Sequence, residues 1–518
     1  MKCFARPRLH SGIKAALALP FLLAVKALLH GLALHRDDWF RDELYYLACA
    51  RRLDWSYVDH PAFSIGVLHL LREAGSSLIV LRLLALCIAC LTLFLASRLA
   101  RDVGAGQRAQ AWTVFALAFA PGFLALHSFY SMNVWEPLFW VLAARLWVRI
   151  AAEGKPAHWY LLAAVFVLGF HNKLSMLWFA LPSLAGAYVQ FGKSAHTRWG
   201  ILLVGLALCF GAIPWLWWQI SHGWPTLEFM RNATQLKMAH VSFLDFWTSQ
   251  LLVFGPLVVL LAISGAMACV FQREFRPRCL LLGVSFLAVA ALLSFSGSSR
   301  AYYLAPAYTI VIPIGAAALV RWASKFRVPA RAQLVVLGAF FLPSLAGIPL
   351  ALPVLGPDAT VSYAATLHIP LPREERFGES ELPQHLADRY GWQELASAVL
   401  EAVASLPPDV REKVTVIATN YGEAAALEFY ARGHPIATRI ASPHNNYWYW
   451  ARPSTWSEHF VTVGFPTDSL QSFCSETKEL ARVQCRWCRA GERGAVIAYC
   501  RYGGNAFQRD WARLRKFL

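Results

Sequence analysis

Acidic side chains gather in one segment between the first two long apolar stretches of the chain. Asp42 and Glu43 stand side by side, and Asp59 and His60 follow in the same segment. A carboxylate near a membrane surface is suited to take a proton from a hydroxyl group, which is general-base chemistry. In the alternative interpretation, Asp42 and Glu43 only cap a short helix and pair with Arg36 or Arg41. The segment therefore predicts a proton acceptor or a helix cap at Asp42.

Further polar residues lie at the ends of other apolar stretches, on the side of the chain where this segment is expected. Lys173 is notable because it interrupts an apolar run from 159 to 191. A ring of cations around a few carboxylates suits a phosphorylated, anionic substrate. Each basic residue taken singly could equally extend its charged end to the membrane interface. The candidate substrate-binding residues are Asp59, His60, Asn133, Glu136, Lys173, Glu228, Arg231, Arg300, Tyr302 and Tyr303.

The composition predicts a polytopic membrane protein. Of 518 residues, 57% are hydrophobic and 15% charged, whereas soluble domains carry about 25% charged residues. These values exclude disordered, collagen-like and disulfide-scaffold classes. A membrane span needs roughly 20 apolar residues, and the run 159–191 is expected to form two helices that meet at Lys173. The other nine expected spans cover 13–34, 78–97, 110–129, 135–152, 199–218, 249–271, 279–296, 303–321 and 332–354, so eleven are predicted.

The loop charges predict the orientation of these spans. Lys and Arg concentrate in alternate loops and at the N-terminus, where Lys2, Arg6, Arg8 and Lys14 stand. By the positive-inside rule these parts are cytoplasmic. The N-terminus is then inside, the segment 35–76 is outside, and an odd number of spans places the C-terminus outside. Much of the net charge of +17 is explained in this way, so nucleic-acid binding is not expected.

From about residue 357 the apolar density falls and a small α/β domain is predicted. Strand-like segments at 414–418 and 495–499 alternate with helix-like segments at 392–404 and 423–432. The expected division is therefore a membrane part at 1–356 and an outer α/β domain at 357–518. Structural disulfides are expected there, without a readable pairing, and a thioredoxin-like or zinc-binding Cys-x-x-Cys is the alternative. The four cysteines are Cys474, Cys485, Cys488 and Cys500.

Several of these segments together resemble bacterial GT-C glycosyltransferases of the protein O-mannosyltransferase-like and aminoarabinose lipid A transferase-like type. The resemblance is carried by Arg41-Asp42-Glu43-Leu-Tyr-Tyr and by the segments 57–61, 131–138, 171–175, 223–229, 302–308, 420–430 and 444–448. It implies a GT-C fold of about eleven transmembrane helices, with interfacial helices in the first outer loop and a periplasmic α/β domain. It also implies a multi-pass protein of the bacterial inner membrane.

The resemblance further implies a polyprenyl-phosphate-linked sugar as donor, with Asp42 as base and Glu43 as helper. The segment 59–61 matches the point where aminoarabinose transferases hold the lipid phosphate. This chain has His60 where those relatives have Lys, and a neutral imidazole is a weaker phosphate partner than an ammonium group. It has Asn133 where many members have Asp, which moves attention to Glu136.

The expected reaction is a single displacement with inversion at the anomeric carbon, since a lipid phosphate leaves as a stable anion and no second, nucleophilic carboxylate is needed. No cofactor is required. A divalent metal at Asp42, Asp59 or His60 is compatible with the sequence, although no ligand spacing defines a site. The expected acceptor is lipid A or another envelope glycolipid. The alternatives are a protein O-glycosyltransferase, a flippase for a lipid-linked sugar, and a sensor or assembly subunit.

Overall fold

A computed structural model describes residues 9–34, 36–71, 77–371, 375–376, 380–503 and 507–518. Lys2, Arg6 and Arg8, on which the predicted orientation partly depends, lie outside the described residues. The described residues form two compact units. The first contains the residues up to Leu34 together with Leu81–Trp215 and His240–Leu355. The second contains the segments that start at His35, Leu216 and Gly356 and end at Val80, Ala239 and Leu518.

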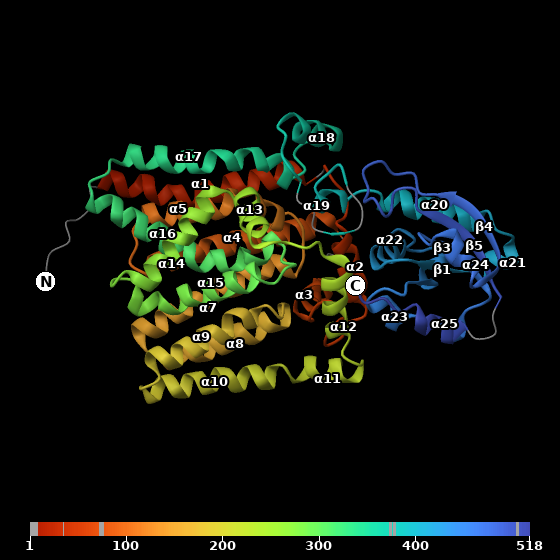
Figure 1. Cartoon of the computed structure of the whole chain (residues 1–518), viewed down its shortest axis with the longest axis horizontal. Helices are drawn as coiled ribbons and strands as arrows, with labels where there is room; N and C mark the ends of the chain where they lie inside the picture. The colour runs from red at the N-terminus through yellow and green to blue at the C-terminus, as the bar shows by residue number, and fades with distance from the viewer. Residues whose placement is uncertain (1–8, 35, 72–76, 372–374, 377–379, 504–506) are drawn as a thin grey trace. The chain divides into compact units, whose positions relative to one another are not determined.

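The first unit is helical, and Figure 1 shows its long helices running alongside one another. A helix or a pair of helices occupies each of the eleven predicted spans. Ser131 begins α7 by accepting a hydrogen bond from the Asn133 amide, and the next two helices meet at Lys173 as predicted. The helices, of which α4 and α11 extend into segments of the second unit, are α1 (Leu9–Ala33), α4 (Leu78–Asp102), α5 (Gln107–Phe119), α6 (Pro121–Leu126), α7 (Met132–Glu153), α8 (Pro156–Asn172), α9 (Met176–Phe191), α10 (Ala195–Gly211), α11 (Ile213–Ser221), α13 (Phe243–Val253), α14 (Pro256–Phe271), α15 (Arg276–Ser294), η3 (Ala301–Leu304), α16 (Ala305–Lys325) and α17 (Ala330–Ala351).

Fewer than eleven of these helices are long and apolar enough by themselves to cross a membrane. In the described part of the chain five meet both conditions, and a sixth is added if α13 and α14, bent by 114°, count as one span. α9 has 16 residues and so is only about 24 Å long, less than a hydrocarbon core of about 30 Å. The count of eleven therefore exceeds what helix length and apolarity support. The five are Leu78–Asp102, Ala195–Ser221, Arg276–Ser294, Ala301–Lys325 and Ala330–Ala351.

α16 is the central helix of the first unit. In the segment Ala301–Lys325, which contains it, 83% of the most apolar stretch is buried. It packs against α14 at a close approach of two glycines. A Cβ atom on Gly315 would lie 1.9 Å from the carbonyl oxygen of Leu261, and one on Gly265 would lie 2.1 Å from that of Val311. Only glycine allows the two backbones to come this near, as in other membrane helix pairs.

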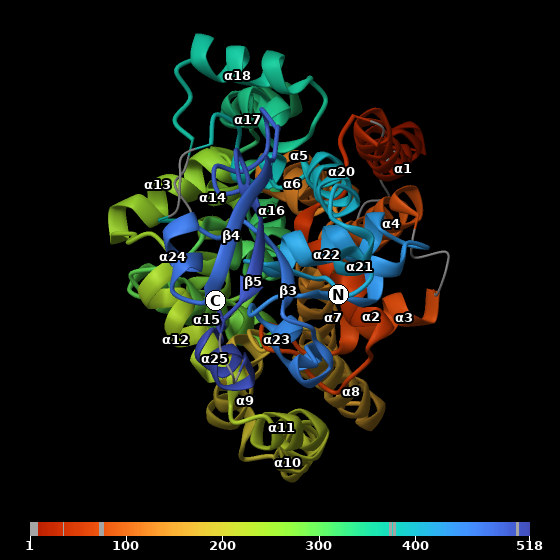
Figure 2. The same cartoon turned by 90° about the vertical axis from the view of Figure 1, so that its right-hand side faces the viewer.

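The second unit contains a mixed five-stranded sheet in the order β2-β1-β3-β5-β4. β1 pairs in parallel with β2 and β3, and β5 pairs antiparallel with β3 and β4. Figure 2 shows β3, β5 and β4 lying side by side. All four residues of β1 are buried, as expected for an interior parallel strand. The strands are β1 (Thr415–Ala418), β2 (Ile440–Ala441), β3 (His459–Val463), β4 (Cys474–Arg482) and β5 (Val496–Tyr502).

The helices of this unit include α2 and α3 from the first outer loop as well as those of the C-terminal part. α20 has the predicted bounds, and α22 lies within two residues of its predicted bounds. Phe40, Leu44, Leu47 and Leu53 have the spacing of one apolar helix face; the first three are buried in the protein, whereas Leu53 is exposed. The helices are α2 (Arg41–Arg51), α3 (Phe63–Leu71), α12 (Pro225–Asn232), η2 (Ala233–Lys237), α18 (Pro357–Thr366), α19 (Gln384–Ala387), α20 (Trp392–Ala404), α21 (Pro408–Arg411), α22 (Tyr421–Tyr430), η4 (Pro435–Thr438), α23 (Asn446–Trp450), η5 (Pro453–Thr455), α24 (Thr467–Gln471) and α25 (Phe507–Arg513).

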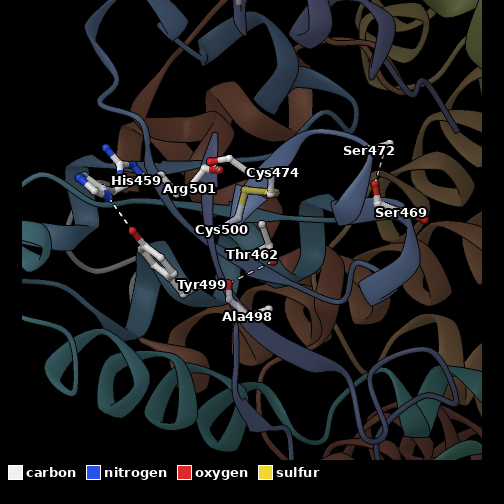
Figure 3. Close-up of a disulfide and its surroundings, with 10 residues drawn as sticks. His459, Thr462, Ser469, Ser472, Cys474, Ala498, Tyr499, Cys500 and Arg501 are labelled. Carbon is white, nitrogen blue, oxygen red and sulfur yellow. Dashed lines mark hydrogen bonds between the residues drawn. A yellow bond between two sulfur atoms is a disulfide. The ribbon is translucent and has the colours of Figure 1, made fainter. Parts of the chain in front are cut away.

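One disulfide joins Cys474 and Cys500 across the antiparallel pair of β4 and β5 (Figure 3). It holds the edge strand β4 to the rest of the sheet. Cys485 and Cys488 are free thiols. Of the four cysteines expected to form structural disulfides, two do so and two do not.

Candidate active site

Asp42 lies in the first turn of α2, where the partial positive charge of a helix N-terminus favours a carboxylate. Its Oδ1 atom accepts a hydrogen bond of 2.9 Å from the hydroxyl group of Tyr421 at the start of α22. The side chain is only partly buried. A partly exposed carboxylate fixed by one hydrogen bond retains lone pairs that can take a proton from a bound hydroxyl group.

Glu43 has a different surrounding from Asp42, although the two are adjacent. It is fully buried, and its Oε2 atom accepts a hydrogen bond of 2.9 Å from the backbone N–H of Phe40. Phe40 is the residue that begins α2, so Glu43 satisfies a donor that the helix leaves unpaired. In this geometry Glu43 acts as a helix cap.

Glu43→Ala is expected to destabilise the protein by about 1 kcal/mol or more through loss of this cap. Glu43→Gln keeps an acceptor oxygen and should have a smaller effect. Thermal unfolding of the detergent-solubilised variants, followed beside transfer activity, measures both effects. A Glu43→Gln variant that unfolds normally but has lost its turnover would instead place Glu43 in the chemistry.

Asp59 is held close to the same place by Tyr45. The Tyr45 hydroxyl lies 3.2 Å from Oδ1 of Asp59 and 3.2 Å from Oδ1 of Asn446. Oδ1 of Asn446 also accepts the N–H of Val58 at 2.8 Å, which ties the loop before Asp59 to α23. Burial raises the pKa of the Asp59 carboxyl, and the negative charge of nearby Asp42 raises it further, while His60 opposes the shift. Asp59 therefore holds a proton more readily than an ordinary aspartate.

A packed aromatic pair connects the two aspartates. The rings of Tyr45 and Tyr421 have centroids 4.5 Å apart, and the Arg41 guanidinium lies 4.3 Å from the Tyr421 ring centroid. Arg41 passes directly over Gly422, where a Cβ atom would lie 2.7 Å from its Nε atom, so glycine is needed there. We call Asp42, Tyr45, Asp59, Tyr421 and Asn446 the acid cluster.

The C-terminal end of α2 is also fixed to α22. Glu428 forms ion pairs with Arg51 at 3.3 Å and Arg52 at 3.0 Å. Oε2 of Glu428 accepts a hydrogen bond of 2.9 Å from the hydroxyl of Tyr447. Contacts near both ends of α2 thus hold it against α22, and this sets the position of Asp42.

His60 is buried among three tyrosine rings, with a side chain that is 1% exposed. The ring centroids of Tyr46, Tyr57 and Tyr45 lie 4.6, 4.9 and 5.9 Å away. Nδ1 of His60 lies 3.1 Å from the carbonyl oxygen of Pro61, and Nε2 lies 3.8 Å from Asp59. A phosphate group would have to displace part of this aromatic cover to contact His60.

A second group of predicted residues meets in the first unit around Lys173. Its ammonium group lies 2.7 Å from Oε2 of Glu136 and 2.9 Å from Oδ1 of Asn133. The hydroxyl of Ser175 donates to the other carboxylate oxygen of Glu136. The rings of Tyr303 and Tyr302 lie 5.4 and 5.9 Å from the ammonium group. We call Asn133, Glu136, Lys173, Tyr302 and Tyr303 the lysine cluster.

Lys173 keeps some exposure within this cluster, with 16% of its side chain accessible against 5% for Glu136. An ammonium group has three donors, and two of them are used by Asn133 and Glu136. The remaining donor and the exposed part of the side chain can serve an anionic oxygen. Arg300 immediately precedes η3, which contains the two tyrosines, and its side chain is half-buried.

Glu228 and Arg231 lie on α12 in the second unit. Glu228 pairs with Arg515 at 2.9 Å, with side chains that are 31% and 42% exposed, respectively. The side chain of Arg231 is exposed as well. Among the described residues, no hydrogen bond or ion pair joins Glu228 or Arg231 to the acid cluster. An exposed ion pair of this kind contributes little to stability.

The predicted residues thus fall into two groups within separate units. Asp42, Asp59 and His60 gather in the second unit, and Asn133, Glu136, Lys173, Tyr302 and Tyr303 gather in the first. Sequence reasoning did not select Tyr45, Tyr421 and Asn446 as site residues, although all three stand in the segments that carry the family resemblance. No group of three or more His, Cys, Asp or Glu side chains is arranged for a metal ion in the described part of the chain.

Comparison with solved structures identifies the fold. ArnT from Cupriavidus metallidurans bound to undecaprenyl phosphate is 15% identical, with a TM-score of 0.60 over 93% of this chain and 97% of that chain. Its apo state gives a TM-score of 0.58 at 15% identity over 94% and 98%.

The archaeal oligosaccharyltransferase AglB from Archaeoglobus fulgidus, in complex with an inhibitory peptide and a dolichol-phosphate, is 13% identical, with a TM-score of 0.50 over 86% and 69%. No family model and no curated protein sequence matches the chain. The chain has the GT-C fold, with a helical membrane part and a small C-terminal α/β domain.

Proposed function

We propose that this protein is an inverting glycosyltransferase that moves a sugar from a polyprenyl-phosphate-linked donor to an acceptor at the outer face of the membrane. The observation that carries the proposal is the setting of Asp42, a partly exposed carboxylate on α2 that is fixed by Tyr421. Two structures of the same fold, ArnT with undecaprenyl phosphate and AglB with a dolichol-phosphate, bind polyprenyl phosphates. Their ligands support a lipid phosphate as the carrier of the donor sugar.

In the proposed reaction, an acceptor hydroxyl oxygen attacks the anomeric carbon of the donor sugar. The bond from that carbon to the phosphate oxygen breaks, and the hydroxyl proton passes to the Asp42 carboxylate. The product leaves with inverted configuration, because the attack occurs opposite the departing phosphate. Tyr421 keeps one carboxylate oxygen occupied, so the other oxygen faces the proton.

The lysine cluster is proposed to stabilise the leaving lipid phosphate. Lys173 supplies the positive charge, and Glu136 and Asn133 fix its ammonium group, which limits the rearrangement needed when phosphate arrives. Tyr302, Tyr303 and Arg300 are proposed to contact the same substrate. Asp59, which holds a proton more readily than an ordinary aspartate, and buried His60 are proposed to position the substrate near Asp42. Glu228 and Arg231 are proposed to contact the acceptor.

The protein is a multi-pass membrane protein, and we propose that its N-terminus is cytoplasmic and that residues 357–518 lie in the periplasm, beyond a membrane part at 1–356. The loop charges support this orientation. So does the disulfide between Cys474 and Cys500, since disulfides persist in oxidising compartments.

A phosphatase reporter fused after residue 518 should be active if the C-terminus is periplasmic, and a fluorescent protein at the same place should be dark. A bright fluorescent fusion together with an inactive phosphatase fusion would contradict this orientation.

The proposed acceptor is lipid A or another envelope glycolipid. Mass spectrometry of envelope glycolipids from a deletion strain and its parent tests this assignment. The parent should contain a glycolipid heavier by one sugar residue that the deletion strain lacks, and re-expression should restore it. Unchanged glycolipids beside a lost sugar on envelope proteins would instead identify a protein acceptor.

A further inference from the structure

Cys485 and Cys488 form a close thiol pair in the loop between β4 and β5. The backbone N–H of Cys488 donates to Sγ of Cys485 at 3.0 Å, and Sγ of Cys488 donates to the carbonyl oxygen of Cys485 at 3.2 Å. Cys485 is partly exposed and Cys488 is 1% exposed. The pair therefore has one accessible and one protected sulfur, the arrangement of an attacking and a resolving thiol.

The environment favours the thiolate form of the accessible sulfur. The nearby Cys488 side chain and the hydrogen bond from the Cys488 backbone N–H lower the pKa of Cys485, and the nearby Cys485 side chain raises the pKa of Cys488. A thiolate is the form that attacks a disulfide bond. The Cys474–Cys500 disulfide of the same domain lies on the neighbouring strands.

The thiol pair packs against the turn that carries Asp388 and Arg389. Gly391 lies directly beneath it, since a Cβ atom there would be 2.7 Å from Sγ of Cys485 and 2.7 Å from Cβ of Cys488. Arg489, the residue after Cys488, bonds Glu375 at 2.7 Å and Asp388 at 3.1 Å. A movement of Cys488 therefore acts directly on the side chains around Asp388.

The same turn holds the beginning of α2. The backbone N–H of Arg41 donates to the carbonyl oxygen of Asp388 at 3.0 Å. The neighbouring Arg389 is buried and forms an ion pair with Asp37. A short chain of contacts thus runs from the thiol pair through Arg489 and Asp388 to Arg41, which precedes Asp42.

We propose that Cys485 and Cys488 are a redox-active dithiol whose oxidation changes the setting of α2. The oxidant is a disulfide, either a small molecule or a protein. The Cys485 thiolate attacks one sulfur of the oxidant, forms a mixed disulfide and releases one thiol. The Cys488 sulfur, after losing its proton, attacks Cys485 and releases the second thiol. The pair loses two electrons and two protons, and the oxidant becomes two thiols.

Its effect on sugar transfer rests on the proposed function, whereas the redox chemistry does not. Bond formation must turn the Cys488 sulfur away from the Cys485 carbonyl and toward the Cys485 sulfur. Because Arg489 is the next residue, this change is passed to Asp388 and then to the start of α2. A shift of about 1 Å in a catalytic group can change a rate by about a hundredfold, and we expect oxidation to change transfer at least about tenfold.

The test uses the purified full chain equilibrated in mixtures of reduced and oxidised glutathione, then alkylated and digested with trypsin. Trypsin cleaves after Arg482, Arg486 and Arg489 and so separates Cys485 from Cys488, unless a disulfide joins the two peptides. We expect a reversible two-electron transition between separate alkylated peptides and one joined pair. Hydrogen exchange of the peptide that contains residues 37–46 should change across the same transition.

The Cys485→Ser/Cys488→Ser double variant, which keeps the Cys474–Cys500 disulfide, is the control. Its hydrogen exchange near residues 37–46 should not respond to glutathione. Peptides that stay separate under every glutathione mixture would overturn the proposed dithiol. A joined pair with unchanged exchange near α2 would overturn the coupling. If no sugar is transferred in either redox state, the proposed function fails, and the peptide and exchange measurements still decide this inference.

Discussion

Asp42→Asn is expected to lower the rate of sugar transfer by about a hundred- to ten-thousand-fold, the usual range for loss of a general base. The amide keeps the shape of the side chain and can still accept the hydrogen bond from Tyr421. It cannot take the proton of the acceptor hydroxyl. Single-turnover transfer from a radiolabelled polyprenyl-phosphate sugar, together with equilibrium binding of that donor, separates the chemical step from substrate binding.

The matched control for this variant is Asp54→Asn, an identical change in the same outer segment. The Asp54 carboxylate accepts the backbone N–H of Trp55 at 2.7 Å in an exposed setting, so the control should transfer sugar at close to the parental rate. Near-parental turnover of Asp42→Asn with a lowered melting temperature would show that Asp42 is a helix cap. Asp59 would then be the next carboxylate to test.

Lys173→Ala should raise the KM for the donor by about 10- to 100-fold, because a hydrogen bond to a charged group contributes about 1.5–3 kcal/mol. Lys173→Arg retains the charge and should weaken donor use less. The alanine variant also leaves Glu136 buried without its cation, which can destabilise a protein by about 3–5 kcal/mol. Donor-dependent kinetics and thermal unfolding should therefore be measured together.

The Lys173→Ala/Glu136→Gln double variant separates these two effects. Removing the carboxylate charge should restore most of the stability without restoring donor affinity. Lys193→Met, at an exposed lysine that follows α9, is the control for loss of one positive charge. A stable double variant with the parental KM would show that Lys173 serves only as the partner of Glu136.

Local patterns in the sequence predicted most of the helices. The apolar stretches gave a helix at each expected position, and the polar break at Lys173 separated α8 from α9. The periodic segment 392–404 has the bounds of α20. Such features depend on residues close together in the chain, which sequence patterns report directly. The number of spans was harder to predict, because the length of a short or bent helix does not show whether it crosses the membrane.

The partners of the candidate residues could not be predicted in this way. Tyr421 meets Asp42 across 379 positions of sequence, and no local pattern reports so distant a hydrogen bond. The burial of His60 under three tyrosines depends on tertiary packing in the same way. The cap formed by Glu43 was one of two alternatives that the sequence left open, because α2 is preceded by Phe40 rather than by the Ser, Thr, Asp or Asn that usually marks such a start.

Sugar transfer from a lipid phosphate with Asp42 as the base can be followed in a single assay. Purified protein is incubated with a polyprenyl-phosphate sugar labelled at its anomeric carbon and with a glycolipid extract of the bacterial envelope, and the product is examined by NMR. The parental protein should form a glycoside whose anomeric configuration is opposite to that of the donor, and Asp42→Asn should bind the donor and form almost none. A product with retained configuration would exclude an inverting transfer, and equal yields from both proteins would exclude Asp42 as its base.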